Sequence, residues 1–142
     1  MLQLNWVFDE YFARPEIWES VFRPFGVESM PVLNRKGAVL STVVQLVNRE
    51  RVPVDSRDLP LAACTVCGRP KYAVVTRGPA PGPDTQPAGH LVRSREWFGD
   101  GASAANEVIA SQALRDAVVR ARVGGITFDP MTTRVNSLDS NP

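Results

Sequence analysis

Residues 106–131, NEVIASQALRDAVVRARVGGITFDPM, predict a short strand, a capped helix, a glycine stop and a second strand. The apolar run at 108–110 is too short for a helix and contains β-branched residues, which favours a strand. Ser111 stands where a helix N-cap belongs, because its hydroxyl can accept a hydrogen bond from a backbone N–H of the first turn. This unit indicates how the chain is built and points to no chemistry.

The helix after Ser111 should bury one face. Its apolar side chains recur at helical spacing: Leu114, Ala117, Val118 and Ala121. Gly124 and Gly125 can take the left-handed conformation of a helix C-terminal cap. Residues 126–128 should then form a strand, which Pro130 ends.

The bulk composition is ordinary for a folded domain. At 142 residues, with 44% apolar and 22% charged residues, the chain can bury a sizeable core. A formal net charge of +1 argues against nucleic acid or an anionic membrane as the partner. No run approaches the roughly 20 apolar residues of a transmembrane helix, and the N-terminus lacks the basic start of a signal peptide. We therefore expect a cytosolic protein.

The N-terminal half predicts a strand, a helix and a hairpin. The opening strand is expected at 4–8, and Pro15 suits the first position of a helix, where its missing N–H costs nothing. Gly26 should stop that helix. The hairpin has its turn at 34–37 and an apolar, interior strand at 39–47.

The middle of the chain predicts shorter pieces. Residues 51–54 should form an edge strand, 71–77 and 91–94 two further strands, and 95–98 a helical turn. Residues 78–89 hold four prolines and three glycines, which exclude helix and interior strand and predict an exposed, mobile surface loop.

Together these elements predict an α+β fold, in which two main amphipathic helices pack on a mostly antiparallel sheet of about five to seven strands. Residues 1–131 should form a single domain, and residues 132–142 a flexible polar tail. The core is expected to contain these side chains: Trp18, Phe22, Leu46, Leu114, Val118 and Phe128.

The sharpest motif is C-x-x-C-G-R at 64–69. Cys64 and Cys67 could supply two thiolates to one tetrahedral zinc ion, and the glycine after them permits the tight turn of a zinc knuckle. Four ligands are needed, so the pair is a candidate half-site, to be completed by His90 and an aspartate or by a second copy of the chain. The alternative is a packed turn with reduced thiols, and we expect no stoichiometric zinc in the monomer. A thioredoxin-like redox role is disfavoured because Pro70 argues against a following helix.

Other groups give weaker signals. Catalysis through a Ser–His or Cys–His pair would depend on His90, the sole histidine, which lies among glycine and proline residues. No phosphate-binding glycine loop, H-E-x-x-H or G-x-S-x-G motif occurs, so we expect no enzymatic activity. Trp97 and Phe98, flanked by charged residues, are either an exposed partner-binding hot spot or ordinary core.

With C-x-x-C-G-R about forty residues before VIASQALRDAVVRARVGGITFDPM, the chain resembles the double-CXXCG-motif family of myxobacteria and, more broadly, immunity proteins of bacterial polymorphic toxin systems. GVESMPVLNRKG at 26–37 and VVQL at 43–46 extend the similarity, which covers residues 18–131. The namesake family has two such motifs, whereas this chain has one. The resemblance implies a non-enzymatic cytosolic protein that neutralises a cognate toxin by binding it. The alternative is a metal-knuckle adaptor for another protein partner.

Overall fold

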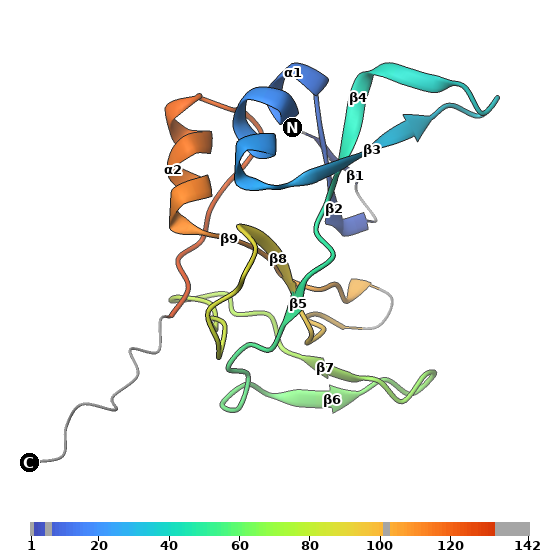
Figure 1. Ribbon diagram of the computed structural model, residues 1–142. Helices are drawn as coiled ribbons and strands as arrows, with labels where there is room; N and C mark the ends of the chain where they lie inside the picture. Colours follow the sequence, from blue (N-terminus) through green and yellow to red (C-terminus); the bar gives the residue numbers. More distant parts are fainter. Residues whose placement is uncertain (1, 5–6, 101–102, 133–142) are drawn as a thin grey trace, which may run out of the picture.

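The structure, a computed structural model, describes residues 2–4, 7–100 and 103–132 (Figure 1). The described residues form nine strands, with these bounds: β1 (Leu2–Leu4), β2 (Val7–Ala13), β3 (Glu28–Leu33), β4 (Val39–Val47), β5 (Arg51–Val52), β6 (Leu61–Ala63), β7 (Pro70–Tyr72), β8 (Leu91–Ser94) and β9 (Val108–Ala110). The helical segments are α1 (Pro15–Ile17), the π-helical turn η1 (Trp18–Phe22), the 3-10 turn η2 (Arg23–Phe25) and α2 (Gln112–Arg120). No helix in these ranges is long and apolar enough to cross a membrane.

The strands lie in three separate sheets, of four, three and two strands, with the orders β1-β2-β4-β3, β5-β8-β9 and β6-β7. All neighbours are antiparallel except β5 and β8. The predicted α+β content and mostly antiparallel pairing are confirmed, but a single sheet of about five to seven strands is wrong. The four-stranded sheet ends at β1 and β3, and the strands that follow β4 pair with one another in two other sheets.

The three-stranded sheet separates two apolar cores, because neighbouring residues of a strand point to opposite faces. In β8, Leu91 packs against the first core and Val92 lies in the second. In β9, Ala110 packs against the first core and Ile109 lies in the second. The first core is buried between the helical segments and the four-stranded sheet: Ala13, Val21, Phe22, Val27, Leu46, Leu114 and Val118. The second is formed by Val52, Val54, Val92, Phe98 and Ile109.

Arg93 of β8 joins the two larger sheets through a nearly buried ionic network. Its side chain is 12% exposed and donates from Nη1 to Asp9 Oδ2 at 2.9 Å and from Nη2 to Glu10 Oε1 at 2.7 Å. Its Nε donates to Asn48 Oδ1 at 2.5 Å. Asp9 and Glu10 belong to β2, so one guanidinium fixes the angle between two sheets that share no backbone hydrogen bond.

The predicted helix starts and the hairpin turn are found, with one unexpected helix end. Pro15 is the first helical residue, and Gly26 ends the segment with φ 73°. The Ser111 hydroxyl accepts from the Leu114 N–H at 3.2 Å, as an N-cap does. At the other end of α2, however, Arg122 takes the left-handed conformation (φ 51°), in place of Gly124 or Gly125.

That helix end is a Schellman motif, so the glycine cap prediction is wrong. The N–H of Arg122 donates to the Val119 carbonyl at 3.0 Å, and the N–H of Val123 to the Val118 carbonyl at 3.2 Å. Val123 also packs against the first core, which is the apolar contact that accompanies this motif.

Several predicted elements are absent from the described residues or shorter than expected. Residues 126–128 form no strand, and Phe128 is 37% exposed, so its place in the predicted core is wrong. Residues 95–98 form no helical turn, because Phe98 instead pairs with Ala105 and Tyr72 in isolated bridges. The remaining five members of the predicted core lie in or against the first core.

The middle of the proline-rich segment 78–89 packs against residues 130–132. The expectation of an exposed loop is therefore wrong for this part of the segment. Pro81 and Gly82 are buried. The Ala80 N–H donates to Pro130 O at 2.9 Å, and the Gly82 N–H donates to Thr132 Oγ1 at 3.0 Å. Of the predicted tail, Thr132 thus contacts the body, and residues 133–142 lie outside the described part. A segment without regular structure is held because its backbone groups find partners far away in sequence.

Candidate functional site

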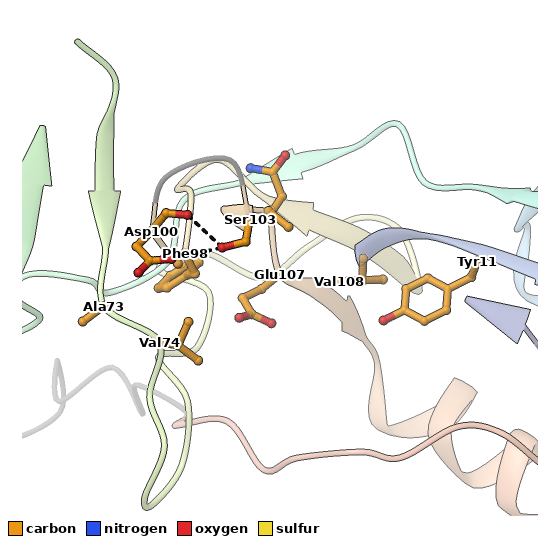
Figure 2. Close-up of a pocket in the computed structure, with 11 residues that line it drawn as sticks. Tyr11, Ala73, Val74, Phe98, Asp100, Ser103, Glu107 and Val108 are labelled. Carbon is orange, nitrogen blue, oxygen red and sulfur yellow. Dashed lines mark hydrogen bonds between the residues drawn. The ribbon is translucent and has the colours of Figure 1, made fainter. Parts of the chain in front are cut away.

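An open groove of about 590 Å³ lies beside the start of β9, with the segment after β7 and the turn after Phe98 on its other sides (Figure 2). Its apolar walls include Ala73, Val74 and Val108. The polar side chains at the groove come from distant parts of the sequence: Tyr11, Asp100, Ser103, Asn106 and Glu107. None of the described lining residues is basic.

Glu107 is held firmly at its backbone. Its N–H donates to Ser94 Oγ at 2.9 Å, and its carbonyl accepts from the Ser94 N–H at 2.9 Å. Ser94 is completely buried, so this double contact fixes where the Glu107 side chain starts. The side chain projects into the groove, and the Tyr11 hydroxyl points toward it (Figure 2).

The Glu107 carboxylate has no hydrogen-bond or ion-pair partner among the described residues. Burial, and then the negative charge of Asp129, raise the pKa of Glu107. Burial, Glu107 and Asp9 raise the pKa of the Tyr11 hydroxyl in the same region. A carboxylate with only partial access to water and no cation beside it favours a positively charged ligand.

At the rim of the groove, Ser103 is hydrogen-bonded to Asp100 of the same turn. The Ser103 hydroxyl lies 2.8 Å from the Asp100 carbonyl oxygen and 3.0 Å from its carboxylate. Because no histidine lines the groove, this pair lacks the base that would activate a serine nucleophile. The turn positions the rim.

Trp97 and Phe98 are adjacent in sequence but differ in burial. Phe98 is 4% exposed and belongs to the second core, so the core interpretation holds for it and the partner-binding prediction is wrong. Trp97 is half-buried, and the Arg69 guanidinium stacks 4.4 Å from its ring centroid. Trp97 therefore stays a candidate contact residue, together with Arg69.

The CXXC motif forms a tight turn between β6 and β7. The Gly68 N–H donates to the Cys64 carbonyl at 2.8 Å, and Gly68 has φ 66°, as expected for a glycine required by the turn. Hydrogen bonds from the backbone N–H groups of Cys67 and Val66 and from the Cys67 thiol lower the pKa of the Cys64 thiol to about 7. Cys64 is half-buried and Cys67 is exposed.

His90 lies at the start of α2. Its Nδ1 is 2.7 Å from Ser111 Oγ, and its ring meets Phe25 edge-on at 5.1 Å. Within the described ranges no group of three or more His, Cys, Asp or Glu residues could hold a metal ion. The completion of the Cys64–Cys67 half-site by His90 and an aspartate of the same chain is therefore not found.

Comparisons of the chain with protein families, with curated proteins and with solved structures found no match. The candidate site thus rests on its geometry. Glu107 and Arg93 belong to no sequence motif, so neither was predicted as a functional residue. The one local signal at Glu107 was an acidic residue directly before the apolar run 108–110. Without the strand register, the sequence does not show on which face of the sheet that side chain lies.

Proposed function

We propose that this chain is a non-enzymatic binding protein that neutralises a cognate toxin by direct contact, in the manner of an immunity protein. The observation that supports this best is the half-buried Glu107 carboxylate, which faces an open groove and has no partner among the residues that the structure describes. Such a group weakens the fold of the free protein, so its position is better explained by a ligand than by stability.

The chemistry of the groove favours an arginine or lysine side chain of the toxin as the group that enters. The Glu107 carboxylate would pair with the cationic end, and Asp100 at the rim adds a second negative charge. Val74 and Val108 offer apolar contact to the aliphatic stem, which long basic side chains bury readily. Trp97 and the stacked Arg69 add an aromatic and cationic contact outside the groove.

The proposal of binding without catalysis follows from how the reactive side chains are used. The Ser103 hydroxyl is bound to Asp100, and His90 is bound to Ser111, away from the groove lining. A metal-knuckle adaptor is the second candidate, favoured by the hydrogen-bonded turn around Cys64. A cytosolic location is part of both proposals.

The test is protection against a toxin encoded beside this chain, measured by growth of cells that co-express the two proteins and by affinity in solution. Glu107→Gln keeps the shape of the side chain and removes its charge. Because a hydrogen bond to a charged group contributes about 1.5–3 kcal/mol, the variant should bind about 10- to 100-fold more weakly and protect poorly.

Glu16→Gln is the matched control, since Glu16 is 62% exposed and pairs with the exposed Arg14 at 3.2 Å. It should bind and protect like the wild type. Full protection by Glu107→Gln, with an unchanged dissociation constant, would exclude the groove as the toxin-binding site.

A further inference from the structure

The turn at 64–69 lies at the outer end of the β6–β7 hairpin (Figure 1). Two backbone hydrogen bonds fix it, from the Cys64 N–H to Arg69 O at 2.9 Å and from the Gly68 N–H to Cys64 O at 2.8 Å. The strands β6 and β7 pair from Leu61–Tyr72 to Ala63–Pro70 and hold both ends of the turn. The turn is therefore a defined, protruding feature of the chain.

Cys64 and Cys67 stand three positions apart in the same tight turn. The hydrogen bond from the Gly68 N–H to the Cys64 carbonyl closes this turn around both cysteines. Two thiolates on one zinc ion stand about 3.8 Å apart, because each Zn–S bond is about 2.3 Å. Two cysteines separated by two residues are the spacing with which a tight turn holds one zinc ion.

Nothing in the described part of the chain completes or covers the pair. No third His, Cys, Asp or Glu residue joins the two thiols there. Cys67 is exposed, and Val66 between the cysteines is 93% exposed. An apolar side chain at the tip of a hairpin is available for contact with another molecule.

We propose that this turn is one half of a zinc site and that the same turn of a second copy of this chain supplies the other half. Two copies related by a twofold axis bring four thiolates to one tetrahedral ion, the closed ligand set of a structural zinc site. The four thiols release four protons as zinc binds, and nothing is oxidised or reduced. The two exposed Val66 side chains would meet beside the axis.

Charge complementarity also favours a second copy. A zinc ion with four thiolates carries a net charge of −2, and each copy places Arg69 and Lys71 next to its cysteines. Arg69 is held in place by its stacking on Trp97, 4.4 Å from the ring centroid. The paired turns would thus surround the negative centre with four cations.

The experiment titrates the reduced, full-length chain with zinc and measures bound metal and molar mass together. The expected end point is one zinc per two chains, and the apparent dimer dissociation constant should fall by at least about 10-fold at saturation. Cobalt(II) in place of zinc should give the visible absorption of a tetrahedral tetrathiolate site. A chelator should return the protein to monomer.

Cys64→Ser/Cys67→Ser is the decisive variant, and it should lose both zinc binding and dimerisation while its Tm stays that of the wild-type monomer. Replacing Val66 by Ser keeps all four ligands and should weaken the dimer without changing the ratio of one zinc to two chains. One zinc per chain at monomer mass, no zinc binding, or a zinc-dependent dimer that persists in the double-serine variant would each overturn the proposal. None of these results bears on Glu107, so the groove is tested separately.

Discussion

Replacement of Arg93 by methionine should destabilise the protein far more than the same change at an exposed arginine. Methionine keeps the apolar stem and removes the guanidinium, so Asp9 and Glu10 lose their shared cation. Removing one member of a fully buried ion pair costs about 3–5 kcal/mol. Because the two carboxylates remain 19% and 24% exposed, water recovers part of that cost, and we expect about 2–4 kcal/mol.

Urea denaturation followed by far-ultraviolet circular dichroism measures this loss. With a slope of about 2 kcal/mol per molar urea, the midpoint for Arg93→Met should fall by about 1–2 M with the slope unchanged. Arg14→Met is the control, since Arg14 is 70% exposed and its pair with Glu16 lies on the surface. It should change the free energy of unfolding by less than about 0.5 kcal/mol.

A rescue variant separates the loss of the cation from a packing defect. Asp9→Asn and Glu10→Gln, added to Arg93→Met, remove the two carboxylate charges that have lost their cation and should restore part of the stability. Equal losses in Arg93→Met and Arg14→Met would show that the network between the sheets contributes no more than a surface ion pair.

Three further predictions concern the backbone and the groove. Gly82→Ala should cost about 1–3 kcal/mol, because a Cβ there would overlap the Thr132 carbonyl oxygen and break the hydrogen bonds between the two segments; Gly124→Ala, with open space around its Cβ, should be neutral in the same thermal melt. Arg122→Gly should stabilise by about 1 kcal/mol, since it removes a side chain from the left-handed region; a loss of stability would show that the arginine side chain matters more than its backbone. Glu107→Gln should raise stability at pH 7 by less than about 1 kcal/mol, given the partial access to water. Because the pKa of Glu107 is raised in the folded state, protonation of Glu107 stabilises the wild type below the ordinary carboxyl pKa of about 4.3. The wild type loses this contribution as pH rises through the folded-state pKa. The difference between the two proteins should therefore grow from pH 4 to pH 7, and a constant difference would contradict it.

The sequence alone determined the features that depend on residues within about four positions of one another. Pro15 begins the first helix, Gly26 ends it, and Ser111 caps α2. The hairpin turn at 34–37 is formed as predicted, with the Gly37 N–H donating to the Asn34 carbonyl at 2.9 Å. Local hydrogen bonds and restricted dihedral angles decide these features, and both can be inferred from neighbouring residues.

Strand pairing was decided by the tertiary structure. Periodicity showed that the run at 39–47 was apolar on both faces, and it correctly placed this strand inside a sheet. It could not show that the sheet ends after four strands, or that the run at 126–128 pairs with none of the strands in the described residues. Strand partners are hydrogen-bonded groups from distant parts of the chain, so an apolar run fits equally well as a strand or as an extended segment on the surface.

The candidate site depended on the fold still more strongly. The CXXC turn is visible in the sequence, because two cysteines and a glycine at fixed spacing define it. Arg93 and Glu107 are ordinary charged residues in sequence, and only their surroundings distinguish them. Arg93 meets two carboxylates more than eighty positions away, whereas Glu107 meets no cation among the described residues. The free energy of a charge depends on how much water it loses and which charges lie beside it, and the folded chain alone determines both.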